Sequence, residues 1–182
     1  NADAKRAIAR RAAALVSDGD SLMLDTGTTT SYVARALLQK RDLTVITNSA
    51  DIARTLATVN GNRVYMAGGE LRADNGAAFG AAAIEFIRRF QVRHSFITIG
   101  AVDAVSGPMD YDFEEADFAR ELLARGENRI MVTDSSKFGR AALVRVCDFD
   151  AIDAVVTEKA PPADLAAVME AAGISILVAG SS

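Results

Sequence analysis

The sequence has only one cysteine and one histidine among its 182 residues. Cys147 therefore cannot form an internal disulfide. It follows an apolar stretch, which is more typical of an inert core thiol than of a nucleophile. His94 has no cysteine or histidine close to it in the sequence, a pattern that disfavours a metal site or histidine catalysis. The sequence thus predicts no metal and no cofactor.

Long apolar runs and a net positive charge are also absent. No segment approaches the roughly 20 consecutive apolar residues of a membrane-spanning helix, and no secretory signal is recognisable. We therefore expect a cytoplasmic protein that does not contact a membrane. The formal net charge is −4. This charge argues against DNA binding by this chain alone, because lysine and arginine must neutralise the phosphates of a nucleic acid.

Nucleotide-binding signatures are missing too. No Gly-x-x-x-x-Gly-Lys-Ser/Thr is present, and no Gly-x-Gly-x-x-Gly follows a predicted strand. Half of the residues are hydrophobic but only 6% are aromatic. This composition favours a core of alanine, valine, isoleucine and leucine, as in α/β proteins.

Apolar strands alternate with amphipathic helices along the chain. The pattern predicts strands at 21–24, 43–47, 63–67, 94–100, 128–133, 142–146, 154–157 and 174–178, with helices between most of them and one before the first. This alternation predicts an α/β fold with a mostly parallel open sheet and helices on both faces. No linker divides residues 1–182, so we expect a single domain, with a small subdomain possible within 140–160.

The stretch from Asp25 to Tyr32, which reads Asp-Thr-Gly-Thr-Thr-Thr-Ser-Tyr, joins a strand to a helix. The first amides of a helix lack internal partners, and the helix dipole places about half a positive charge there. A phosphate or carboxylate satisfies both. Gly27 permits close approach of the backbone, and the hydroxyls of Thr28, Thr29, Thr30 and Ser31 add donors. An ordinary hydroxyl N-cap is the alternative for this stretch taken alone.

Four more polar turns follow apolar strands. In an open parallel sheet, ligands bind beyond the carboxyl ends of the strands. The five turns therefore predict one shared site. They are residues 25–30, 47–49, 68–69, 100–103 and 134–139, and they contribute Asp25, Gly27, Thr28, Thr29, Thr30, Thr47, Asn48, Ser49, Gly68, Gly69, Gly100, Asp103 and Lys137.

Charged side chains give this site two different ends. The ammonium of Lys137 suits a phosphate, although an exposed surface lysine is the alternative. Asp103, Asp112 and Glu115 can accept hydrogen bonds from sugar hydroxyls or act as bases. Alternatively, Asp103 forms a turn and the other two begin a helix. Taken together, these groups predict a pocket with a phosphate end and a polyol end.

The order of these motifs resembles the C-terminal effector-binding domain of DeoR-type bacterial transcriptional regulators. The resemblance runs from the first helix to at least Thr157 and includes Gly80, Glu115-Ala116 and the run Asp134-Ser135-Ser136-Lys137-Phe138-Gly139. It implies a fold similar to ribose-5-phosphate isomerase, glucosamine-6-phosphate deaminase and CoA transferases, and an effector that is a phosphorylated sugar or related metabolite. It also implies an N-terminal winged helix-turn-helix, which is absent from this chain, and a homo-oligomer.

The resemblance also assigns roles to residues. It implies that Gly27 to Thr30 and Lys137 hold the phosphate, that Asn48, Ser49 and Gly69 lie nearby, and that Asp103 and Glu115 face the sugar. Two departures from the family pattern occur. Glu158 stands where the family often has aspartate, and residues 107–110 form an individual version of a variable loop that we expect to cover the pocket.

Three functions remain open from the sequence. The first is a sensor whose sugar-phosphate ligand controls DNA binding by the missing domain. The second is a sugar-phosphate isomerase with Asp103 or Glu115 as the base. The third is an oligomerisation domain without a ligand. The resemblance favours the sensor.

Overall fold

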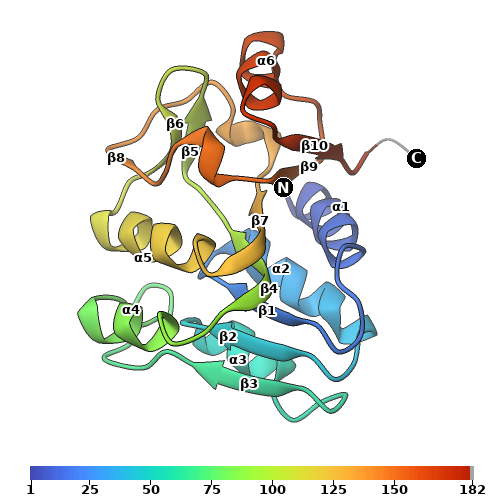
Figure 1. Cartoon of the computed structure of the whole chain (residues 1–182), viewed down its shortest axis with the longest axis vertical. Coiled ribbons are helices and arrows are strands. Elements are labelled where there is room, and N and C mark those ends of the chain that lie inside the picture. Colours follow the sequence, from blue (N-terminus) through green and yellow to red (C-terminus); the bar gives the residue numbers. More distant parts are fainter. Residues whose placement is uncertain (181–182) are drawn as a thin grey trace.

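A computed structural model describes residues 1–180 (Figure 1). Within them lies a seven-stranded sheet in which every neighbouring pair of strands runs parallel, in the order β10-β9-β7-β4-β1-β2-β3. Its strands are β1 (Ser21–Leu24), β2 (Thr44–Thr47), β3 (Arg63–Met66), β4 (Val92–Ile97), β7 (Gly126–Val132), β9 (Ala154–Thr157) and β10 (Ser175–Val178). The predicted parallel sheet is confirmed.

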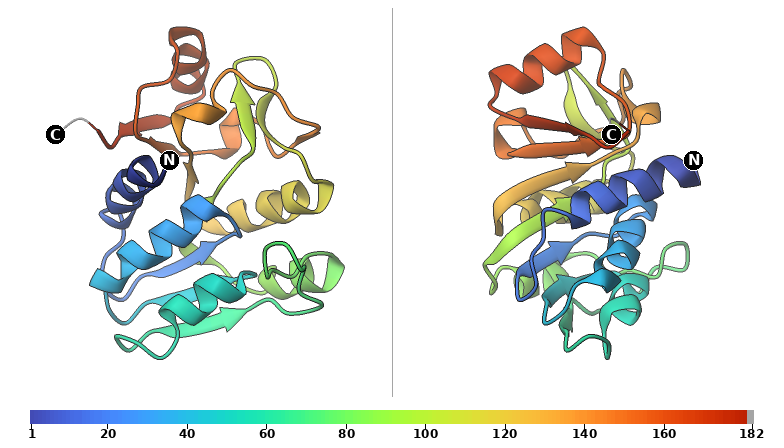
Figure 2. Two further views of the ribbon diagram at one scale, coloured as in Figure 1. Left: turned by 180° about the vertical axis from the view of Figure 1, so that it is seen from behind. Right: turned by 90° about the vertical axis from the view of Figure 1, so that its right-hand side faces the viewer.

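Helices cover both faces of this sheet, as predicted (Figure 2). One face carries α1 (Ala2–Ala13), α2 (Thr28–Ala36) and α3 (Ala50–Leu56). The other face carries α4 (Ala81–Ile87), α5 (Phe113–Leu123) and α6 (Ala163–Ala171). Short 3-10 turns occur at Leu37–Gln39, Ser135–Lys137 and Phe149–Ala151.

The central strands are buried on both sides, and β1 shows why. Successive side chains of a strand point to opposite faces. Leu22 and Leu24 accordingly pack with α1, α2 and α3, whereas Met23 packs with α4 and α5. A parallel sheet covered on both faces requires such an uninterrupted apolar run.

A second, antiparallel sheet was not predicted. It consists of β5 (Ala101–Asp103), β6 (Gly107–Asp110) and β8 (Val144–Arg145), in the order β5-β6-β8. The sequence showed 101–108 only as a segment rich in turn formers. The expected strand at 142–146 is shorter and pairs with β6 instead of joining the main sheet. Gly107, at φ 71, makes the tight hairpin possible, because glycine adopts positive φ without strain.

The order of the strands reverses at β1. From β1 the chain builds β2 and β3 toward one edge, and β4 then returns to the other side of β1. The segments that leave the carboxyl ends of β1 and β4 therefore diverge. A crevice opens at such a switch point in parallel sheets, and this is where they bind ligands.

Candidate functional site

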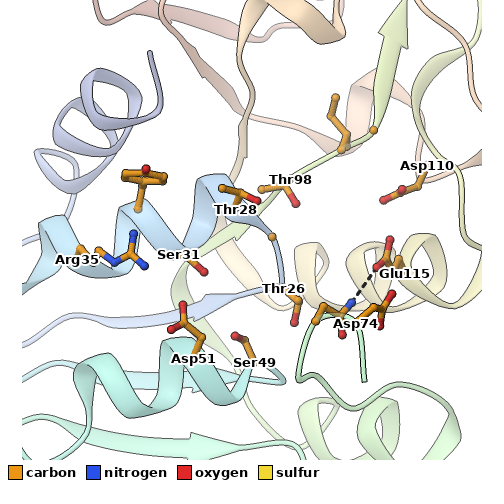
Figure 3. Close-up of a pocket in the computed structure, with 15 residues that line it drawn as sticks. Thr26, Thr28, Ser31, Arg35, Ser49, Asp51, Asp74, Thr98, Asp110 and Glu115 are labelled. Atoms are coloured by element: carbon orange, nitrogen blue, oxygen red, sulfur yellow. Dashed lines mark hydrogen bonds between the residues drawn. The ribbon is translucent and has the colours of Figure 1, made fainter. Parts of the chain in front are cut away.

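A pocket of about 590 Å³ lies at this switch point (Figure 3). Its walls come from the ends of β1 and β4, the starts of α2, α3 and α5, the loop between β3 and α4, and β6. Five of the predicted residues line it: Gly27, Thr28, Ser49, Gly100 and Glu115. Ten further residues complete the lining: Thr26, Ser31, Tyr32, Arg35, Asp51, Asp74, Asn75, Thr98, Ile99 and Asp110.

Gly27 brings the start of α2 close to the end of β4. Its φ of 175° is ordinary extended backbone, so conformational strain does not explain the glycine. The reason is space, since a Cβ at this position would overlap Oγ1 of Thr98. Gly27 is also the N-cap of α2 and provides no side-chain cap. The alternative of a hydroxyl N-cap at this helix start is therefore wrong, and the first amides of α2 receive no hydrogen bond from a capping side chain.

Asp25 lies beneath the pocket floor. Both of its carboxylate oxygens accept from the backbone N–H of Thr98, at 3.2 and 3.0 Å, and so tie the end of β1 to the end of β4. Burial raises the pKa of Asp25 well above its ordinary value, and the charges of Asp110 and Glu115 raise it further, while the Thr98 amide opposes the shift.

The three threonines at the start of α2 face different surroundings. Thr28 lines the pocket. Thr30 is buried and donates its hydroxyl hydrogen to the carbonyl oxygens of Asp25 and Gly27, at 2.9 and 3.1 Å. Its hydroxyl therefore stabilises the turn rather than lining the pocket. Thr29, together with Thr28, borders a smaller neighbouring cavity.

The turn after β2 contributes one lining residue and two buried supports. Ser49 lines the pocket and caps α3 by accepting from the N–H of Ile52 at 3.2 Å. The Asn48 side chain accepts from the Thr26 hydroxyl at 3.0 Å and donates to the carbonyl of Ala78 at 2.8 Å. Thr47 accepts from the amide of Ser49. Asn48 thus joins three segments of the rim, and Thr47 supports the turn that carries Ser49.

Nine of the fourteen predicted residues lie outside the lining, and three of these are Gly68, Gly69 and Asp103. Gly68 is exposed, and Gly69 turns the chain at φ 144. The carboxylate of Asp103 accepts from the amides of Val105 and Ser106 in the β5–β6 hairpin. These two bonds also lower the pKa of Asp103, with the Ser106 amide as the larger cause. The turn-forming alternative describes Asp103, and the structure does not bring it to the pocket with the other residues.

Lys137 borders the smaller cavity, of about 120 Å³. Thr28 and Thr98 separate this cavity from the main pocket, since both residues line both spaces. Lys5 of α1 also lines it and lies 3.9 Å from Asp134. Two ammonium groups therefore flank the N-terminus of α2. The sequence did not identify Lys5, because a basic residue on an amphipathic helix is usually solvated.

Glu158, one of the departures from the family pattern, supports the segment that carries Lys137. Its carboxylate accepts from the amide of Ser135 at 2.7 Å and from the Ser135 hydroxyl at 2.9 Å. Asp134 accepts from the amide of Ser136 at 2.9 Å. The longer glutamate side chain thereby anchors the 3-10 turn that places Lys137.

The opposite end of the pocket is acidic. Burial raises the pKa of both Asp110 and Glu115, and the charges of neighbouring acidic residues raise both pKa values further. Arg72 partly offsets this charge, because it contacts Asp112 and Glu114 and lies 3.7 Å from Glu115. Asp110 belongs to the variable loop 107–110, so one residue of this loop lines the pocket, and covering of the pocket by the loop stays a prediction.

The loop between β3 and α4 closes this acidic end. Asn75 donates to Glu115 at 3.1 Å, and both Asn75 and Asp74 line the pocket (Figure 3). Arg72 of the same loop stacks on Phe79, 4.4 Å from the ring centroid. No periodic pattern marked these loop residues. Ser31, Tyr32 and Arg35, in contrast, follow Thr28 at helical spacing and were detectable as one face of α2.

Within residues 1–180, no group of three or more histidine, cysteine or acidic side chains is arranged to hold a metal ion. In the same part of the chain, no helix combines the length and apolar character that crossing a membrane requires.

Comparison with known proteins supports a regulatory family. The glycerol-3-phosphate regulon repressor of Escherichia coli (strain K12) is 34% identical over 165 residues, which are 91% of this chain and 66% of that protein. The HTH-type transcriptional repressor CsqR of the same strain is 31% identical over 174 residues, which are 96% of this chain and 67% of that protein. The chain thus spans about two thirds of the length of these relatives.

A solved structure shows the similarity of fold. Ribose 5-phosphate isomerase A from Methanocaldococcus jannaschii has a TM-score of 0.54 at 17% identity, over 76% of this chain and 55% of that one. The family model described as the DeoR C-terminal sensor domain matches residues 1–159. The chain therefore belongs to the DeoR family of transcriptional regulators and carries its C-terminal sensor domain.

Proposed function

We propose that this domain binds a phosphorylated sugar or polyol in the 590 Å³ pocket and its smaller neighbour. The observation that carries the proposal is the polarity of the combined space. A helix N-terminus with two lysines and one aspartate, Asp134, stands at one end, and carboxylates without a lysine stand at the other. A ligand with a phosphate and several hydroxyl groups matches both ends.

The phosphate is assigned to the start of α2. The amides of Thr28 and Thr29 begin a helix whose cap has no side chain, so they can donate to an anion. Lys137 and Lys5 border the same cavity and add positive charge. Gly27 allows the ligand and the end of β4 to approach this turn closely.

The hydroxyl groups are assigned to the acidic end. Carboxylates of Asp110 and Glu115 accept hydrogen bonds from hydroxyls, and the amide of Asn75 adds a donor and an acceptor. Burial raises the pKa of both carboxyl groups, which favours their protonated form relative to that of an exposed carboxyl group. Asp103 is left out of this assignment because its carboxylate serves the hairpin.

The regulatory output is assigned to a region outside residues 1–182. The relatives are named repressors, and the chain spans about two thirds of their length. We infer that ligand binding alters the DNA affinity of a helix-turn-helix domain joined to this one. A homo-oligomer and a cytoplasmic location remain predictions.

A thermal-shift series tests the ligand assignment. A ligand at 100 times its dissociation constant adds about 2.7 kcal/mol to the free energy of unfolding. We expect at least one of glycerol, ribose, fructose and glucose phosphates to raise the melting temperature, and Lys137→Ala to abolish the increase. Lys159→Ala, which removes an exposed lysine after β9, is the control. A shift that survives in Lys137→Ala contradicts the phosphate assignment.

The isomerase alternative depends on Glu115. Repressor relatives point away from an enzyme, but Glu115 lines the pocket on a fold shared with ribose 5-phosphate isomerase. A base must reach the proton beside the substrate carbonyl. Incubation with ribose 5-phosphate and fructose 6-phosphate, followed by chromatography, decides the point. Turnover that Glu115→Gln abolishes would replace the sensor assignment.

A further inference from the structure

A second cavity, of about 360 Å³, lies between α1 and α2. Three arginines line it: Arg6 and Arg10 from α1, and Arg35 from α2. The remaining lining residues are Tyr32, Ala9 and Ala36, so the lining contains no carboxylate. This concentration of positive charge is unusual in a chain whose net charge is −4.

The arginines have few anionic partners. Among residues 1–180, Arg10 and Arg35 form no salt bridge, and Arg6 pairs only with Asp3, at 3.1 Å, where both side chains are mostly exposed. An exposed pair of this kind contributes little. Arg6 and Arg35 also lie over the same ring, 5.9 and 5.1 Å from the centroid of Tyr32. Two guanidinium groups of like charge therefore both lie close to the ring of Tyr32.

The three cavities lie in succession along α2 and share lining residues. Thr28 lines both the smallest cavity and the main pocket, and Tyr32 and Arg35 line both the main pocket and the arginine cavity. Residues 28, 32 and 35 share one face of the helix. Figure 3 shows Thr28, Ser31 and Arg35 in succession along this face. From Thr28 to Arg35, the helix rises about 10 Å along its axis.

Asp51 is the one acidic residue beside Arg35 in the main pocket. It does not form a salt bridge with Arg35 within the described chain, and it does not line the arginine cavity. Asp51 thus does not neutralise the guanidinium group of Arg35, which can contact a ligand in the arginine cavity.

We propose that Arg6, Arg10 and Arg35 form a second phosphate-binding site, which takes the distal phosphate of an effector phosphorylated at both ends. Planar guanidinium groups bind phosphate through paired hydrogen bonds, and several together tolerate its double charge. A hexose bisphosphate can lie along this face of α2, with one phosphate at the start of the helix and the other beside Arg35. This proposal rests on the proposed function, which concerns the first phosphate.

Calorimetry tests the site with fructose 1,6-bisphosphate and fructose 6-phosphate. We expect the bisphosphate to bind about tenfold more tightly, the effect of one charge-assisted contact. Arg35→Gln and Arg10→Gln should each bring the two affinities close together. Arg54→Gln, an exposed arginine on α3, is the control and should preserve the difference.

A titration with inorganic phosphate, followed by ¹H–¹⁵N NMR, tests the site without a sugar. Saturable shifts at the arginine side-chain N–H groups that disappear in Arg35→Gln support it. If these shifts occur but the bisphosphate binds no more tightly than the monophosphate, the site binds a separate phosphate ion and not the distal phosphate of the effector. If neither effect occurs, the second site is refuted. Monophosphate binding that survives in Lys137→Ala contradicts the proposed function alone, so the two proposals can fail separately.

Discussion

At the scale of single residues, Gly27 and Asp25 shape the end of β1 for different reasons. Gly27 leaves room for the side chain of Thr98. Asp25 bonds to the backbone of the same residue. One position thus depends on an absent side chain and the other on a buried carboxyl group, and each leads to its own prediction.

Gly27→Ala should destabilise the domain by about 1–3 kcal/mol, because an added methyl group overpacks against Thr98. Urea unfolding measures the change. Thr98→Ala in the same chain removes Oγ1 and Cγ2 but leaves Cβ at 3.2 Å from the added carbon, so we expect a partial rescue. Strictly additive effects of the two substitutions would show that the overlap is not the cause.

Asp25 should make stability depend on pH. Burial raises its folded pKa above the ordinary value of 3.8. The stabilisation that Asp25 contributes to the folded state is therefore fully present below pH 3.8, and it is lost as pH rises through the folded pKa. Asp25→Asn, which cannot ionise, should flatten this part of the profile of unfolding free energy against pH. Asp164→Asn, on the exposed start of α6, is the control. Identical profiles for Asp25→Asn and wild type would refute the assignment.

At the scale of secondary-structure elements, the loop between β3 and α4 is attached to α5 mainly through one side chain. Arg72 contacts Asp112 and Glu114 at the start of α5 and lies near Glu115. These interactions raise the pKa of Arg72, chiefly through Asp112. Since Asp74 and Asn75 of the same loop line the pocket, the attachment positions part of the site.

Arg72→Gln should release this loop while changing global stability by only about 1 kcal/mol or less, as for other partly exposed ion pairs. Hydrogen exchange of amides 70–79 should accelerate, and sugar-phosphate affinity should fall. Arg88→Gln is a matched control. Arg88 pairs at 2.5 Å with Glu121, which also lies on α5, and Arg88 does not line the pocket. Unchanged exchange in Arg72→Gln would mean that other contacts hold the loop.

At the scale of the whole molecule, two apolar cores lie on opposite faces of one sheet, and Cys147 belongs to the core on the α4–α6 face. Burial raises the pKa of its thiol from 9.0 to about 12. The side chain is also only 7% exposed. Its reactivity should therefore report the opening of that core.

Alkylation of Cys147 at pH 8 should be about a thousandfold slower in the folded protein than in urea, from the smaller thiolate fraction alone. Burial slows it further. Phe118→Ala, which leaves a cavity in the same core and costs about 3–5 kcal/mol, should accelerate labelling. Mass spectrometry over time measures both rates. Rapid labelling of the native wild type would place the thiol outside a closed core.

Much of the fold was predictable because hydrophobic periodicity is local. The run around Leu22 to Leu24 identifies a buried strand, and the alternation with helices predicts a parallel sheet. The small sheet was missed although a strand was expected at 142–146, because β5 has only three residues. A strand of that length leaves almost no period in the sequence, and only pairing with β6 defines it.

The residues of the candidate site likewise fall into two groups: those that local sequence patterns identify and those that only long-range packing brings to the pocket. Gly27, Thr28, Ser49, Gly100 and Glu115 were identifiable because they follow strands or begin helices, which are positions the sequence reveals. Asp103 has the same local signature but bonds within its own hairpin. Asp110 and the residues of the loop 70–80 reach the pocket only through long-range packing, which no local pattern encodes.

The sequence by itself determined the fold class, the family and the turn from Asp25 to Thr30, because these rest on periodicity, on the order of motifs and on the chemistry of a helix start. Tertiary structure alone decided which turns share a pocket, that Lys5 joins Lys137, and that Arg6, Arg10 and Arg35 meet around Tyr32. The physical reason is distance along the chain: strand order brings remote segments together, and side-chain charge acts through space.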